Sequence, residues 1–236
     1  MSFEEFFDNP RYLRLKNSLF NYLNRKKSIE EEVKKLELDF KNIKILDIGS
    51  GISPVSPFPN NTIFIDKSKK AVSVLKKQGK EAGVGDITKL EIQEKFDIVL
   101  CSEVLEHVKD YEKALREIKR VLKSNGRVIL TVPCYKKYWG FDDEFVGHYR
   151  RFEPEEFESK LNKIFKIIRE KNVGSKLERR LTLIGVRKYE KNKELNKFKV
   201  FLYSKINYFL YLAVRVASKF TRKENASIIL YVCKVK

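Results

Sequence analysis

The sequence has few of the residues that build disulfide frameworks, zinc sites or membrane spans. Only three cysteines occur in 236 residues, far apart and without CxxC spacing, which argues against the first two. We predict that Cys101, Cys134 and Cys233 are small core residues in a reducing compartment. No apolar run approaches the roughly 20 residues that span a bilayer. The N-terminus also lacks the basic start and apolar stretch of a signal peptide, so we predict a cytoplasmic protein.

Acidic residues are also scarce relative to basic ones. The chain has 50 Lys and Arg against 32 Asp and Glu, a net charge of +18. This excess predicts a surface that prefers anionic partners such as nucleic acid, acidic lipid or a phosphorylated substrate. A Lys- and Glu-rich surface of the thermophile kind explains it equally well. Residues 174–224 hold 14 Lys and Arg against 4 Asp and Glu, so the excess is concentrated there.

The chain from 40 to 133 alternates between strand-like and helix-like segments. We predict strands at 43–48, 62–66, 82–85, 96–101 and 127–132, and helices at 68–78 and 108–123 with a stop at Ser124-Asn125-Gly126. This alternation predicts an α/β fold with a parallel sheet, whose ligands bind beyond the carboxyl ends of the strands. Three prolines crowd positions 54–59, so the first connection is predicted to be irregular.

The flanking segments predict a division into four parts: a helical cap at 1–39, a core at 40–173, a basic helical insertion at 174–224 and a last strand at 225–236. The cap carries an apolar stripe that packs on the core or forms a lid over a ligand, and it consists of Leu15, Leu19, Tyr22 and Leu23. A helix near 154–162 and a strand near 164–171 close the core. The run 227–235 is predicted to pair antiparallel with that strand.

The insertion contains one strongly amphipathic segment. Its apolar face consists of Leu202, Ile206, Phe209, Leu210, Ala213, Ala217 and Phe220. The opposite face consists of Ser204, Tyr208, Tyr211, Arg215, Ser218 and Arg222. The apolar face either packs on the sheet or a second subunit, or lies in an anionic membrane interface. The second alternative suits a lipid-linked acceptor.

Carboxylates follow three of the predicted strands. Asp47 precedes the turn Gly49-Ser50-Gly51, in which glycine lets the backbone approach a ligand closely. Asp66 ends the second strand and can accept two hydrogen bonds from a ribose diol. Asp86 ends the third and can bind an exocyclic amine of adenine. Pro54 replaces the third glycine of a dinucleotide fingerprint, which disfavours a nicotinamide dehydrogenase.

These segments resemble the class I S-adenosylmethionine-dependent methyltransferases. The matching stretches are 45–51, 64–66, 85–87, 96–107 and 117–133. The resemblance implies a Rossmann-like sheet, mostly parallel with an antiparallel last strand, and S-adenosyl-L-methionine as cofactor. It assigns cofactor binding to Asp47, Gly49, Ser50, Gly51, Asp66, Lys67, Asp86, Ile87, Ser102 and Glu103, the last two under the sulfonium.

The loop 134–152 resembles a methyltransferase subgroup with the pattern W…DE…GH.RR(Y/F). We predict that it shapes the acceptor pocket through Trp139, Asp143, Tyr149, Arg150 and Arg151. The only two histidines, His107 and His148, are the candidate bases for a hydroxyl acceptor, with His148 favoured. Local capping or packing is the alternative role for each histidine.

The string Glu103-x-x-Glu106-His107 also resembles, together with His148, the metal site of small-RNA 3′-terminal 2′-O-methyltransferases. It is common in methyltransferases that bind no metal, so we assign no metal ligand. The predicted function is methylation of an oxygen on a small-molecule or lipid-linked acceptor. An RNA 2′-O-methyltransferase and a non-catalytic nucleoside-binding protein are the alternatives. The oligomeric state stays open.

Overall fold

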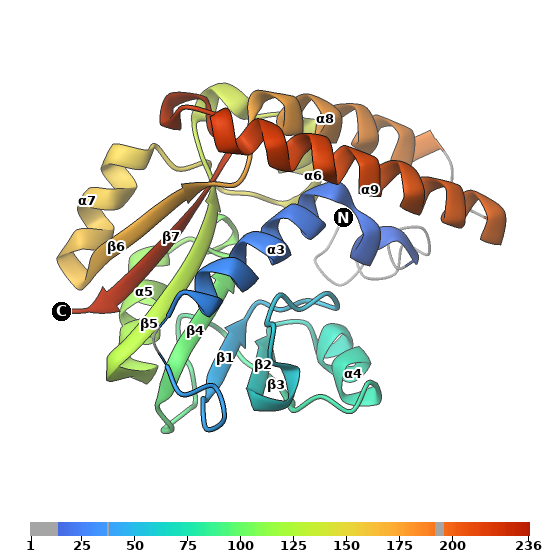
Figure 1. Ribbon diagram of the computed structural model, residues 1–236. Helices are drawn as coiled ribbons and strands as arrows, with labels where there is room; N and C mark the ends of the chain where they lie inside the picture. The colour runs from blue at the N-terminus through green and yellow to red at the C-terminus, as the bar shows by residue number, and fades with distance from the viewer. Residues whose placement is uncertain (1–13, 37, 192–195) are drawn as a thin grey trace.

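A single seven-stranded sheet organises the chain in the computed structural model, which describes residues 14–36, 38–191 and 196–236 (Figure 1). Its strands are β1 Ile45–Ile48, β2 Thr62–Asp66, β3 Ala82–Val84, β4 Phe96–Ser102, β5 Leu122–Pro133, β6 Phe165–Asn172 and β7 Ile228–Val235. Their order is β3-β2-β1-β4-β5-β7-β6. The first five are parallel, and β7 pairs antiparallel with both β5 and β6. The predicted α/β fold and the antiparallel last strand are confirmed.

The helices are α3 Phe20–Lys34, α4 Lys69–Lys77, α5 Tyr111–Val121, α6 Phe141–Val146, α7 Pro154–Ile164, α8 Lys176–Lys191 and α9 Lys197–Phe220. Short 3₁₀ turns occur at Lys16–Ser18, Pro59–Asn61, Leu105–His107, Lys136–Tyr138 and Lys223–Asn225. The proline-rich connection between β1 and β2 contains only the second of these turns, so the predicted irregular crossover is confirmed. None of the described helices is long and apolar enough to cross a bilayer.

One sequence prediction about the α5–β5 junction is wrong. Ser124-Asn125-Gly126 does not stop a helix: α5 ends at Val121, and these residues belong to β5. The strand starts early because Leu122 pairs with Phe96 at the beginning of β4, before a register shift between Phe96 and Ile98. The predicted helix 108–123 also begins later than expected, because α5 starts at Tyr111 and residues 108–110 are not helical.

Helices cover both faces of the sheet and bury its apolar strands (Figure 1). On one face, Ile29 and Val33 of α3 pack with strand residues in one core cluster. On the other, Leu115 of α5 and Phe157 of α7 belong to the larger cluster. The three cysteines are free and buried in this core, as predicted. The strand termini are thereby held rigidly, and the functional side chains follow them.

Candidate functional site

A cavity of about 900 Å³ lies at the carboxyl ends of β1, β2 and β4. All ten residues to which the resemblance assigns cofactor binding line it: Asp47, Gly49, Ser50, Gly51, Asp66, Lys67, Asp86, Ile87, Ser102 and Glu103. Both histidines and Tyr149 line it as well. The parallel topology brings these dispersed residues together because the carboxyl ends of the strands share one edge.

The glycine turn after β1 depends on the absence of side chains. Gly49 and Gly51 have φ values of +68° and +53°, a region that favours glycine. A Cβ atom at Gly49 would lie 2.3 Å from Cγ2 of Val104. The Gly49 amide donates to the Ile65 carbonyl at 2.7 Å, which fixes the turn to β2. At its two glycines the turn therefore presents backbone, not side chains, to the cavity.

Asp66 fixes the same turn from the end of β2. Its Oδ2 accepts the Gly51 amide at 2.7 Å, and its Oδ1 accepts the Ser68 amide at 2.8 Å. A carboxylate oxygen can accept more than one hydrogen bond, and Asp66 lines the cavity. The residue can hold the turn and accept hydroxyl groups of a ribose at once.

Asp86 lies at the far side of the cavity. Its Oδ1 accepts hydrogen bonds from the amide and hydroxyl of Thr88, and its Oδ2 lies 3.5 Å from Lys67 Nζ. The backbone hydrogen bond from Thr88 is the main cause that lowers the pKa of Asp86. The carboxylate is therefore ionised at neutral pH and can accept a hydrogen bond from an exocyclic amine.

Asp47 is buried beneath the cavity. Its Oδ2 accepts the amides of Val55 and Ser56 at 3.1 and 3.2 Å, which closes the proline-rich connection over β1. Burial is the main cause that raises the pKa of Asp47 to about 7, and the charge of Asp66 adds to it. Asp47 therefore shapes the wall of the cavity from below.

Several buried polar atoms of the cavity lining have no hydrogen-bond partner among the residues that the structure describes. They include Ser50 Oγ, Ser53 Oγ and Glu103 Oε1. Buried polar groups are nearly always paired, so these atoms fit a polar ligand such as an amino-acid group. Glu103 also has a φ of 56°, a strained value for a residue with a side chain. The residues present therefore fit the methionine part of S-adenosylmethionine.

Helix α3 and the turn before it supply a wall that the sequence analysis did not assign to the site. Lys16, Leu19, Asn21, Tyr22 and Arg25 line the cavity. Arg25 Nη1 lies 3.9 Å from Glu103 Oε2, and the Tyr22 hydroxyl donates to the Pro54 carbonyl. The apolar stripe of the N-terminal segment thus packs on the core while its first turns border the ligand space. Only Leu19 and Tyr22 stood out in the sequence, as part of that stripe.

A second wall comes from the loop before α7, where Asp143 orients His148. The Nδ1 atom of His148 lies 2.7 Å from Asp143 Oδ1. Burial acts to raise the pKa of Asp143, but hydrogen bonds from His148 and Arg151 outweigh it and lower the pKa to about 2. An ionised carboxylate only accepts hydrogen bonds, so Nδ1 carries the imidazole proton. The Nε2 atom of a neutral His148 is then a proton acceptor.

His107 differs from His148 in its surroundings. The two rings meet edge to face, with centroids 4.6 Å apart. Burial first, and His148 second, lower the pKa of His107 to about 4. His107 is therefore neutral at physiological pH and a weak base. Of the two candidate bases, the structure favours His148.

Glu106 lies beside both histidines and is fully buried. Within the described part of the chain, neither of its carboxylate oxygens has a hydrogen-bond partner, and Oε1 lies 3.8 Å from His148 Nε2. Burial, with a contribution from Glu103, raises its pKa. One ligand atom each of Glu106, His107 and His148 lie within 4.8 Å of one another, an arrangement that can hold a divalent cation.

The other predicted acceptor residues are not among those that line the cavity. Arg151 is buried and binds Asp143, as does Arg179, which the sequence analysis missed. Arg150 donates to the Lys109 carbonyl and lies over the Tyr111 ring. Trp139 is 40% exposed and donates to Glu144. Asp143 and Arg151 therefore support the loop from behind, and no pattern in the sequence marked Arg179.

Known proteins share this fold and part of this sequence. Residues 46–130 match the family model described as a methyltransferase domain. The uncharacterized methyltransferase YcgJ of Bacillus subtilis is 35% identical over 46% of this chain and 47% of that protein. A ubiquinone biosynthesis O-methyltransferase of Rickettsia typhi is 25% identical over 86% of this chain and 88% of that protein. The chain spans about half the length of the first curated relatives it matches.

A solved structure extends the likeness to the whole fold. A Thermotoga maritima S-adenosylmethionine-dependent methyltransferase, described as a possible histamine N-methyltransferase, has a TM-score of 0.62 and 19% identity over 99% of this chain and 98% of that one. Residues 46–130 therefore resemble the methyltransferase domain family, and the chain shares its overall fold with this methyltransferase structure.

Proposed function

We propose that this protein transfers the methyl group of S-adenosylmethionine to a hydroxyl oxygen, with His148 as the general base. One observation carries the proposal. An imidazole lines the cofactor cavity, and the ionised Asp143 behind it holds its Nδ1 at 2.7 Å. A carboxylate that orients a histidine and stabilises its protonated form is a recurrent arrangement for general-base catalysis.

The cofactor half of the cavity has a donor and acceptor set that suits S-adenosylmethionine. That cofactor supplies an electrophilic methyl group on a sulfonium, which leaves as a neutral thioether. Asp66 is proposed to accept the ribose hydroxyls, and Asp86 with Ile87 to hold the adenine. The turn Gly49-Ser50-Gly51 is proposed to face the amino-acid part. Glu103, expected under the sulfonium, has a buried oxygen with no hydrogen-bond partner among the described residues, which suits a cationic group.

The proposed proton transfer uses the Nε2 atom of His148. The acceptor hydroxyl donates a hydrogen bond to Nε2, which takes its proton as the oxygen forms its bond to the methyl carbon. The electrons of the broken carbon–sulfur bond stay on sulfur, so charge and atoms balance. Asp143 then stabilises the imidazolium. Positioning of the two reactants and exclusion of water account for the remaining rate enhancement.

The acceptor is proposed to be lipid-linked, with the protein in the cytoplasm and peripheral to the membrane. Two observations support this class over a freely diffusing small molecule. A relative that aligns over 86% of this chain is named for O-methylation in ubiquinone biosynthesis. Helix α9, which contacts α3 of the cavity wall, carries a row of exposed apolar side chains.

Calorimetry and radiolabelling test this function together. We expect heat of binding with S-adenosylmethionine and its demethylated product, and a large loss of affinity in Asp66→Ala. Labelled cofactor incubated with lipid, RNA and small-molecule fractions of a cell extract should label the lipid fraction. No binding in calorimetry contradicts the methyltransferase assignment. Binding without turnover in any fraction favours a non-catalytic nucleoside-binding protein.

A metal-dependent RNA 2′-O-methyltransferase is the second candidate, and the arrangement of Glu106, His107 and His148 favours it. In that case a divalent cation, and not His148, lowers the pKa of the acceptor hydroxyl. Chelator should then abolish turnover, Mn²⁺ should restore it, and RNA binding should weaken steeply with salt. Turnover that is insensitive to chelator, and undiminished in Glu106→Gln, excludes this candidate.

A further inference from the structure

Helix α9 presents its apolar side away from the protein, which is the reverse of an ordinary surface helix. The exposed side chains are Phe198, Phe201, Leu202, Ile206, Tyr208, Phe209, Leu212, Val216 and Phe220, each 41% to 83% exposed. We call this set the α9 outer face. The described residues of α9 bury only Val214 and Ser218. Of the alternatives predicted for the apolar stripe, packing on the sheet is therefore wrong, and a second subunit or a membrane interface is left.

Polar contacts fix α9 in this orientation. On the inner side, Ser218 donates to the Val173 carbonyl, and Arg215 pairs with Glu31 of α3. Asn207 accepts the amide of Phe20, and Ser204 donates to Ser18. These contacts span most of the helix, so rotation of α9 to bury its apolar side would break all of them. The exposure of the outer face is built into the fold.

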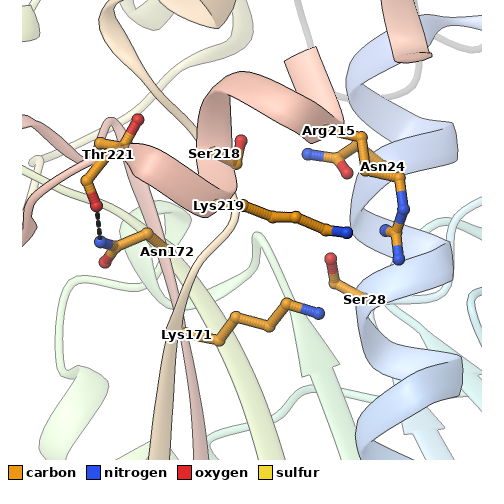
Figure 2. A pocket seen from close by; sticks show the side chains of 8 residues that line it. All are labelled: Asn24, Ser28, Lys171, Asn172, Arg215, Ser218, Lys219 and Thr221. Carbon is orange, nitrogen blue, oxygen red and sulfur yellow. Dashed lines mark hydrogen bonds between the residues drawn. The ribbon is translucent and has the colours of Figure 1, made fainter. Parts of the chain in front are cut away.

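A small cavity beneath the C-terminal end of α9 shows the same polarity (Figure 2). Its volume is about 150 Å³, and it is lined by Asn24, Ser28, Lys171, Asn172, Arg215, Ser218, Lys219 and Thr221. None of these side chains is apolar. Asn172 donates to the Thr221 carbonyl across it. The inner side of α9 therefore makes a polar seam with α3 and β6, while the apolar residues face outward.

The charge of α9 selects the kind of surface that covers its outer face. The helix has no Asp or Glu, and Lys197, Lys199, Lys205 and Lys219 are all exposed. A symmetric contact with a second copy would bring these lysines together without a carboxylate from α9 to neutralise them. Anionic lipid headgroups can pair with them instead. Phenylalanines and a tyrosine beside lysines are typical of helices that lie in a membrane interface.

We infer that the α9 outer face docks on an anionic lipid surface. The 24 residues of α9 form a rod about 36 Å long that lies flat on the membrane. Its inner side touches Ser18 and Phe20, next to Leu19 and Asn21 of the cavity wall, and α3 and α9 lie side by side (Figure 1). Docking therefore sets the α3 wall of the cavity close to the lipid surface. The inference rests on the proposed function for its choice of a membrane-embedded acceptor.

Vesicle flotation in the absence of cofactor tests the docking. The probes are vesicles of equal parts phosphatidylglycerol and phosphatidylcholine, compared with phosphatidylcholine alone, at low ionic strength. The wild type should float with the anionic vesicles. Phe201→Ser/Phe209→Ser should weaken the partition at least about tenfold because two phenyl groups no longer enter the interface. Both side chains are at least 60% exposed, so the variant should fold.

A charge pair of variants supplies the matched control. Lys199→Glu/Lys205→Glu should abolish binding, whereas Lys76→Glu/Lys77→Glu, the same charge change on α4 far from α9, should leave most of it (Figure 1). Equal loss in both pairs, no flotation of the wild type, or a dimer that Phe201→Ser/Phe209→Ser converts to a monomer overturns the inference. Calorimetry of the same variants with S-adenosylmethionine should be unchanged. A failure of docking is thereby distinguished from a failure of the methyltransferase site.

Discussion

Two buried aspartates have pKa values that are shifted in opposite directions, one of them in the cavity lining and the other behind it. Asp47 lies near the carboxyl end of β1. Among the described residues it accepts hydrogen bonds only from the backbone amides of Val55 and Ser56, and its pKa rises to about 7. Asp143, on the loop wall, binds His148, Arg151 and Arg179, and its pKa falls to about 2. Both have exposures of 1% or less, so burial alone does not decide the charge.

The difference reflects how each wall is held. Hydrogen bonds between neighbouring strands fix the carboxyl ends of β1, β2 and β4. The Asp47 carboxyl therefore needs no cationic partner and tolerates protonation. Most of the loop 134–152 has no strand pairing. The ion pairs of Asp143 with Arg151 and Arg179 hold it instead. Substitutions of Asp47, of Asp143 or of their neighbours should therefore have different effects on stability and activity.

Removal of the Asp143 carboxylate should have the largest effect on stability. Asp143→Ala leaves the buried Arg151 and Arg179 without that partner, and we expect about 3–5 kcal/mol lower free energy of unfolding in urea denaturation. Methyl transfer should fall with it because His148 loses its orientation. The control is Asp142→Ala, which removes a less buried partner of Arg179 and should cost less. Equal losses would contradict the central role of Asp143.

Loss of the proposed base should affect turnover and leave binding unchanged. His148→Gln should lower kcat about 10²- to 10⁴-fold, while the cofactor affinity measured by calorimetry stays the same. Lys136→Gln alters an exposed residue of the same loop that is not in the cavity lining and should retain most activity. Full activity of His148→Gln would leave the loop wall without a catalytic role.

A methyl group added at Gly49, in the turn after β1, should have a smaller and local effect. Gly49→Ala imposes a positive φ on alanine and a contact of 2.3 Å with Val104, and we expect a loss of about 1–3 kcal/mol together with weaker cofactor binding. Gly79 has a φ of +73°, but an added Cβ atom would have no neighbour within 4 Å. Gly79→Ala therefore measures the cost of the positive φ alone. Addition of Val104→Ala should partly rescue Gly49→Ala and leave Gly79→Ala unchanged.

The pH dependence of stability should separate the two aspartates. The raised pKa of Asp47 means that the folded protein holds this proton and the unfolded chain releases it near pH 4, so stability falls as pH rises toward 7. Relative to Asp47→Asn without cofactor, the wild type should lose about 1.4 kcal/mol between about pH 5 and pH 6. Asp143 behaves oppositely, since its stabilisation is lost only as pH falls below about 4 toward 2. A flat difference between wild type and Asp47→Asn would show that Asp47 is ionised throughout.

The residues of the cofactor half of the site could be predicted from the sequence because each lies at the end of a strand. Asp66 and Asp86 end apolar runs, and Gly49 follows one. A parallel sheet aligns such ends along one edge whatever the packing around it. The acceptor half was only partly readable. The loop pattern marked Asp143 and His148, but Arg179 and Arg25 come from helices whose approach depends on tertiary packing.

By itself the sequence determined the sheet, the glycine turn and the row of carboxylates, since local periodicity and strand ends are encoded residue by residue. It also determined that 202–220 is an amphipathic helix. Only the tertiary structure decided which side of that helix faces the protein, because the periodicity of a helix is the same whichever side is covered. The bonds of Ser218 and Arg215 to Val173 and Glu31 turned the polar side inward and left the phenylalanines outside.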